Sequence, residues 1–119
     1  MAGVRLSPDA SAEDLLPLAM TIHELVNRLP VTMRSREKPG VRIEDGEVVD
    51  DAYTGPVLEE VLERGEVVRK VPDSGPYEGV PVVVAPIKDG EEVIAAVGVV
   101  DLTYGIYSSI QKVAHRPVR

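Results

Sequence analysis

Two apolar runs separated by a short polar insert make up the last third of the chain. Residues 80–87 and 93–102 are rich in β-branched side chains, and the insert between them contains Asp89-Gly90. An Asp-Gly pair between such runs is typical of a tight hairpin turn, because both residues tolerate the backbone angles that the turn requires. We predict a long β-hairpin over residues 80–103.

A shorter hairpin is predicted upstream. Residues 41–50 repeat the pattern on a smaller scale, with Asp45-Gly46 at the turn. Residues 31–36 alternate between apolar and polar positions and form a candidate strand, which Pro39-Gly40 ends. Residues 66–71 form a further candidate strand, and the Pro- and Gly-rich segment that follows them predicts a surface loop.

Two helices are predicted between and before these strands. Ser11 with Asp14 three residues later predicts a capping box at the start of the first helix. Apolar residues then recur at helical spacing until Pro30. Residues 54–56 begin a second helix, and Gly65 is placed to end it in a left-handed conformation. The apolar positions of the first helix are Leu15, Leu18, Ile22, Leu25, Val26 and Leu29.

The second strand of the long hairpin is apolar on both of its faces. Alternate positions point to opposite faces of a strand, so a half-solvated strand would show polar residues at every second position. Here one face carries valine and alanine at 93, 95, 97 and 99, and the other carries only apolar residues and Gly98. We therefore expect this strand to be central and covered on both sides, with a helix rather than a ligand above its small residues.

The chain is long enough for one domain with a single core, and we expect one domain over residues 1–119. A short third helix is predicted over residues 106–113, and residues 1–10 and 115–119 are expected to fray. No secretory signal and no apolar run of membrane-spanning length is present, which predicts a cytoplasmic protein without membrane contact.

Charge and composition exclude several function classes. The net charge is −7 with no basic face, which argues against nucleic-acid binding. The absence of cysteine excludes disulfides, thiol catalysis and thiolate metal sites. Few side-chain amides and many loop prolines are typical of thermophilic proteins, and the bias of a GC-rich genome explains the same composition equally well.

The order of elements resembles the PAS and Cache sensor domains, which share a profilin-like fold. The resemblance is carried by the two hairpins around Asp45-Gly46 and Asp89-Gly90 and by the amino-acid sequence of residues 79–102. It implies an α+β fold with a five-stranded antiparallel sheet in the order 2-1-5-4-3, an N-terminal helix, and a helix between the second and third strands. Over residues 15–110 the chain also resembles a family of short, uncharacterised archaeal proteins, mostly from methanogens, which implies no activity.

Five residues are the best candidates for a ligand site: Arg69, Lys70, Tyr77, Asp101 and Tyr104. Arg69 and Lys70 are adjacent in a predicted strand, so one of them should point inward, where it needs a carboxylate or an anionic ligand. Asp101 follows the central strand, and the resemblance to sensor domains implies pockets near such strand ends. The open alternative is an Arg–Asp pair, or an Asp that caps the last turn.

Metal and redox chemistry find no support in the sequence. His23 is a lone histidine on the first helix, where a surface or boundary position is expected, and it has no second ligand at metal spacing. Residues 44–51 gather several carboxylates, but without the spacing of a calcium loop they predict a solvated turn. Because the chain contains no Cys, Phe or Trp, no haem, flavin or other cofactor is expected.

Three functions remain as hypotheses. The first is a non-catalytic, sensor-like module that binds a small anionic metabolite through Arg69 or Lys70. The second is a structural or assembly protein whose first helix and sheet edge form a homodimer and whose interior is simply filled. The third is a small enzyme that uses Asp101 and a tyrosine. An apolar pocket with converging polar groups would favour the first over the second. Independently of the choice among these functions, we expect a symmetric homodimer through the first helix, because its apolar stripe and the sheet are hard to cover together in one small domain.

Overall fold

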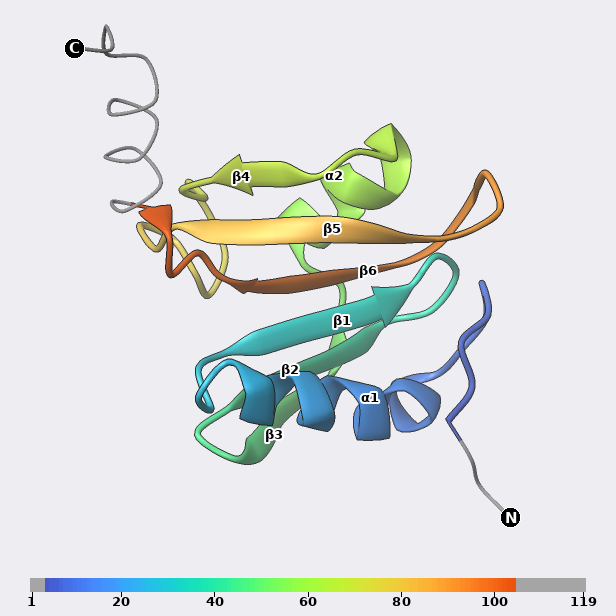
Figure 1. The fold of residues 1–119 in the computed structure, drawn as a ribbon, viewed down its shortest axis with the longest axis horizontal. Coiled ribbons are helices and arrows are strands. Elements are labelled where there is room, and N and C mark those ends of the chain that lie inside the picture. Colours follow the sequence, from blue (N-terminus) through green and yellow to red (C-terminus); the bar gives the residue numbers. More distant parts are fainter. Residues whose placement is uncertain (1–3, 105–119) are drawn as a thin grey trace, which may run out of the picture.

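A computed structural model describes residues 4–104 of the chain (Figure 1). The helix predicted over residues 106–113 and the tail from 115 lie outside the described residues. Two helices and six strands follow one another in the described part. They are α1 (Ala12–Leu25), β1 (Val31–Ser35), β2 (Gly40–Glu44), β3 (Glu47–Tyr53), α2 (Pro56–Arg64), β4 (Val68–Lys70), β5 (Val82–Asp89) and β6 (Glu92–Val100).

The strands form one antiparallel sheet in the order β3-β2-β1-β6-β5-β4. Strand β6 lies between β1 and β5, which confirms the predicted central strand. Both predicted hairpins are present, and their turns carry the left-handed glycines Gly46 and Gly90. The expected mixed α+β architecture is therefore confirmed.

The predicted count of five strands is wrong, because the sheet has six. The five-residue strand β1 is a full member of the sheet, buried at every position and paired with both β2 and β6. As a result, α2 follows the third strand instead of the second. The PAS and Cache type of sheet is not supported.

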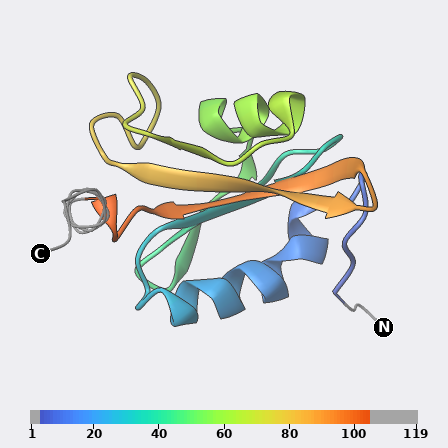
Figure 2. The same cartoon turned by 45° about the horizontal axis from the view of Figure 1, so that its top comes forward.

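The two helices cover opposite faces of the sheet, and Figure 2 shows the sheet edge-on between them. Helix α1 lies over β1, β2 and β3, whereas α2 lies over β5 and β6. The core is correspondingly divided into two clusters. The cluster under α1 contains Leu15, Ala19, Val31, Met33, Val41 and Ile43, and the cluster under α2 contains Leu58, Val61, Leu62, Val84 and Ala96.

Helix α1 begins as predicted and ends earlier than predicted. The Ser11 hydroxyl accepts a hydrogen bond from the Asp14 amide at 3.1 Å, and the Asp14 carboxylate accepts one from the Ser11 amide at 2.9 Å. This reciprocal capping box satisfies amide groups that have no partner inside the helix. After Leu25 the chain reverses through Asn27 and Arg28, both at φ 61°, so the last apolar positions belong to a turn.

Helix α2 begins and ends at glycines with positive φ. Gly65, at φ 70°, ends the helix in the left-handed conformation that the sequence predicts. Gly55, at φ 66°, precedes Pro56 at the first helical position. A Cβ atom at position 55 would lie 2.7 Å from the ring of Tyr53 and 3.1 Å from Leu58, so only glycine lets the last side chain of β3 pass beneath α2.

Candidate functional site

The predicted inward position of Arg69 or Lys70 is wrong. Both side chains are exposed, at 49% and 42% respectively, on the three-residue edge strand β4. Lys70 lies 2.9 Å from Glu60 of α2, and Arg69 lies 3.2 Å from Asp101. The arrangement is therefore the Arg–Asp pair that the sequence left open as an alternative.

Asp101 is nearly buried and has several donors around it. Besides Arg69, its carboxylate accepts hydrogen bonds from the Thr103 hydroxyl at 2.7 Å and the Thr103 amide at 3.0 Å. These donors, led by the Thr103 hydroxyl, lower the pKa of Asp101 below its ordinary value. Tyr104, the last described residue, is exposed. Neither residue lines the pocket described next.

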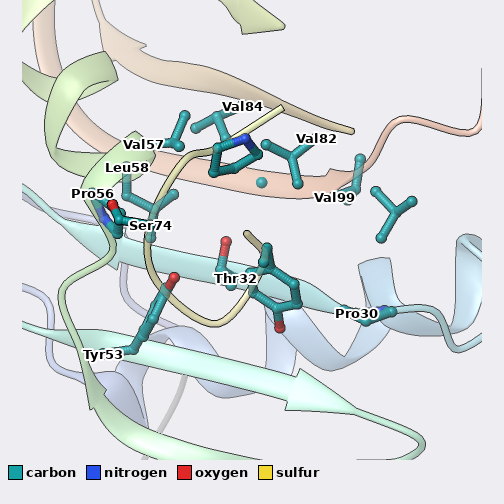
Figure 3. Close-up of a pocket in the computed structure, with 14 residues that line it drawn as sticks. Pro30, Thr32, Tyr53, Pro56, Val57, Leu58, Ser74, Val82, Val84 and Val99 are labelled. Carbon is teal, nitrogen blue, oxygen red and sulfur yellow. The ribbon is translucent and has the colours of Figure 1, made fainter. Parts of the chain in front are cut away.

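An apolar pocket lies on the α2 side of the sheet, between the sheet, the start of α2 and the loop of residues 72–80 (Figure 3). It encloses about 30 Å³, which is room for roughly two water-sized groups. Of the five predicted site residues, only Tyr77 lies in its wall. The lining residues are Pro30, Thr32, Tyr53, Pro56, Val57, Leu58, Pro72, Ser74, Tyr77, Val82, Val84, Gly98, Val99 and Val100.

The outer wall of the pocket is a loop tied to strand β2. The Gly79 amide donates to the carbonyl of Pro72 at 3.0 Å and closes the loop on itself. The hydroxyl of Tyr77 donates to Glu44 Oε2 at 2.7 Å, and the same oxygen lies 2.8 Å from Arg42 Nη1. One carboxylate oxygen thus holds both the loop and a strand arginine.

Arg42 lies between the two pocket tyrosines. Its guanidinium carbon is 5.9 Å from the ring centroid of Tyr53 and 5.9 Å from that of Tyr77. Such contacts stabilise a cation by the charge distribution of the ring faces. Within residues 4–104, the Nε atom of Arg42 is the buried side-chain nitrogen that has no hydrogen-bond partner.

Both tyrosines of the pocket are held in the neutral form. Burial raises the pKa of Tyr77 above its ordinary value, and the Glu44 carboxylate that accepts its proton raises it further. Burial likewise raises the pKa of Tyr53, and the nearby Arg42 acts in the opposite direction. At neutral pH both phenols are therefore hydrogen-bond donors rather than anions.

Two hydroxyl groups in the pocket remain unpaired. Figure 3 shows the oxygens of Thr32 and Tyr53 directed into the space beneath Val57 and Leu58. Within the described chain, neither hydroxyl takes part in a hydrogen bond. Arg42 Nε is the buried side-chain atom without a partner in residues 4–104, so both hydroxyls keep solvent-accessible surface and can pair with water or with a bound molecule.

Sequence reasoning missed Thr32, Tyr53, Arg42 and Glu44. A signal was available for the pair Arg42 and Glu44, because residues two apart in a strand point to the same face. Thr32 and Tyr53 are distant in the sequence, and they come close only because their strands join the same sheet. No local pattern indicates that they share a pocket.

The lining of the pocket contains no carboxylate, histidine, lysine or cysteine. It offers hydroxyl donors and acceptors to a bound molecule and no general base. Residues 4–104 contain no group of three or more metal-ligating side chains. In the same part of the chain, no helix is long and apolar enough to cross a membrane.

The fold and the pocket define a small α+β domain in which a six-stranded sheet and one helix enclose an apolar site. A family described as "Uncharacterized protein conserved in archaea (DUF2111)" matches residues 22–103, and the chain belongs to this family. It is 54% identical to "Uncharacterized protein MJ0405" of Methanocaldococcus jannaschii over 114 residues, which cover 96% of this chain and 87% of the relative. No solved structure matches the chain. The archaeal resemblance is thereby confirmed.

Proposed function

We propose that this protein is a non-catalytic module that binds a small organic molecule in the pocket between α2 and the sheet. The observation that carries the proposal is the pair of unpaired hydroxyls, Thr32 and Tyr53, facing an otherwise apolar space. Binding sites of this kind combine apolar walls with a few polar groups that orient the ligand. The absence of a base among the lining residues favours binding over catalysis.

The size and charge of the pocket define the ligand class. The enclosed volume of about 30 Å³ admits a short apolar group, with the rest of the ligand at the mouth beside the loop. A hydroxyl, carbonyl or carboxyl group on that ligand would pair with Thr32 and Tyr53. Because Arg42 is already engaged by Glu44, an anionic ligand gains less from this arginine than from an unpaired one.

A thermal-shift comparison tests the proposal. Short-chain carboxylic acids of three to six carbons and the matching primary alcohols are added at millimolar concentration. A ligand that binds the folded state alone raises the melting temperature, with about 2.7 kcal/mol of added stability at a hundredfold excess over Kd. A shift by the acids alone would assign an anionic ligand, and a shift by both series would assign recognition through hydroxyl pairing.

Matched variants connect any shift to the pocket. Thr32→Val keeps the shape of the side chain and removes the hydroxyl, and it should abolish the shift. Thr21→Val, the same change on the exposed side of α1, should leave the shift intact. An equal shift in Thr32→Val and wild type would place binding elsewhere, and no shift with any probe would contradict the proposal.

A further inference from the structure

In the described chain, each face of the sheet is covered by a helix over only half of its width. On the α2 side, the half without a helix carries the polar residues Arg42, Glu44 and Asp50. On the α1 side, the half without a helix is apolar along β5 and β6, with Arg69 of β4 at its outer edge. Figure 1 shows this half, strands β5 and β6, lying beside α1 and not beneath it. Tyr77 of the loop 72–80 covers part of the charged half through its contacts with Arg42 and Glu44. An apolar half without a covering element indicates an interaction surface.

The strand register defines this apolar face. Val31 of β1 pairs with Val99 of β6, which in turn pairs with Val83 of β5, so the three side chains form one row across the sheet. Val31, under α1, is fully buried. Val99 packs against the α1 cluster and keeps part of its surface exposed, as does Val83. Ala85 and Ile87 continue the face along β5 with the same partial exposure.

The flank of α1 supplies the complementary surface. Leu18, Ile22 and Leu25 lie three or four residues apart and share one side of the helix. Leu18 and Ile22 are partly buried against the α1 cluster, while Leu25 is 79% exposed. The helix therefore presents apolar surface beyond what its own sheet covers.

The dimensions of the two surfaces match. Two neighbouring strands are about 10 Å wide, which equals the width of one helix with its side chains. The 14 residues of α1 extend over about 21 Å, and the eight residues of β5 over about 27 Å. The bare half of the sheet is thus the size of one α1 helix.

We propose that two copies of the chain associate about a twofold axis, with α1 of each copy packed on the β5–β6 face of the other. Both surfaces lie on the same side of the protomer, as a self-complementary interface requires. The two helix-on-sheet contacts together bury roughly 1,000 Å² of accessible surface, which reaches the lower limit of specific interfaces. The arrangement gives each sheet a second covering helix on its α1 side.

The mass of the full-length protein in solution tests the proposal. Light scattering at micromolar concentration should give twice the chain mass of 12.9 kDa. Leu25→Lys and Ala85→Glu should each give the single-chain mass while circular dichroism stays unchanged. Val49→Glu, a matched change on the far edge strand β3, should leave the dimer intact. A wild-type protein of single-chain mass overturns the proposal.

Mixing the two variants tests the geometry. In the mixture, Lys introduced on one helix meets Glu introduced on the other copy's sheet, so a dimer of mixed composition should form although neither variant dimerises alone. Failure of the mixture to dimerise would show that α1 does not contact β5 of a partner and would overturn the arrangement.

A further variant distinguishes a second copy from other molecules or segments that could cover the β5–β6 face. If the wild type is a monomer and Ile110→Glu in the full chain increases binding of a hydrophobic dye, residues 105–119 cover the face and the proposal is overturned. A monomer whose dye binding does not respond to Ile110→Glu overturns it as well, in favour of a different partner protein.

Discussion

The ring of His23 joins helix α1 to Gly46 in the β2–β3 turn. Its Nε2 atom accepts a hydrogen bond from the Gly46 amide at 2.9 Å, so Nδ1 carries the proton and donates to the carbonyl of Leu29 at 2.8 Å. The side chain is fully buried, where the sequence predicted a surface or boundary position. This histidine is a structural bridge between segments 23 residues apart in the chain.

Replacing His23 with alanine should destabilise the protein by about 2–4 kcal/mol, because it leaves two partly buried backbone groups unpaired and opens a cavity. Urea unfolding followed by circular dichroism measures the loss. Glu24→Ala, on the exposed side of the same helix turn, should change the stability by less than about 0.5 kcal/mol. Equal effects of the two variants would contradict the bridging role.

Gly98→Ala should destabilise the protein by about 1–3 kcal/mol. A Cβ atom at this position would lie 2.8 Å from Thr32 Oγ1 and 2.9 Å from Val84 Cγ2, closer than side chains pack. Adding Val84→Ala to the variant removes one of the two clashes. The free energy of unfolding of the double variant should therefore fall by less than the sum of the decreases in the two single variants. A strictly additive double variant would show that the predicted clash is absent.

Asp101→Asn should reduce the stability by about 1–3 kcal/mol at neutral pH, because hydrogen bonds to a charged acceptor are lost. The pKa of Asp101 is lower in the folded than in the unfolded protein, so its contribution is present above about pH 4 and is lost as the pH falls through the folded value. The difference in unfolding free energy between wild type and variant should therefore shrink on acidification. A difference that is constant from pH 7 to pH 3 would refute this.

Tyr77→Phe should remove a phenol that ionises at a higher pH than an ordinary tyrosine. The pKa of Tyr77 is raised in the fold, so its contribution to stability is present below about pH 10 and is lost as the pH rises beyond it. Ultraviolet titration of wild type and variant at alkaline pH measures the ionisation directly. A difference that titrates near pH 10 would show that neither burial nor the hydrogen bond to Glu44 raises the pKa of Tyr77.

The elements built from local pattern were predictable from the sequence. Asp45-Gly46, Asp89-Gly90 and the capping box at Ser11 act over a few residues, and all three are present in the structure. The membership of β1 in the sheet was harder to predict, because its buried Arg34 depends on distant groups as well as on the neighbouring carbonyls of Ser35 and Arg36. The Arg34 guanidinium donates to the carbonyl of Thr54 and lies 3.7 Å from Glu59 of α2.

The candidate site was predictable only in part. Tyr77 is in the pocket wall, but Arg69 is not, because it lies on the α1 side of an edge strand, where no helix of the described chain covers it. Which half of a sheet face a helix covers depends on long-range packing and not on the strand itself. For the same reason, the sequence did not indicate Thr32 and Tyr53 as pocket residues, because they come together only when β1 and β3 join the sheet.

The two halves of the core share strand β6. Ala96 belongs to the cluster under α2, and the next residue, Val97, packs against the cluster under α1. Neither helix can therefore leave the sheet without exposing side chains on a strand that also supports the other. Heat or denaturant should melt both layers in one cooperative transition, with the same midpoint whether helix content or tyrosine environment is followed.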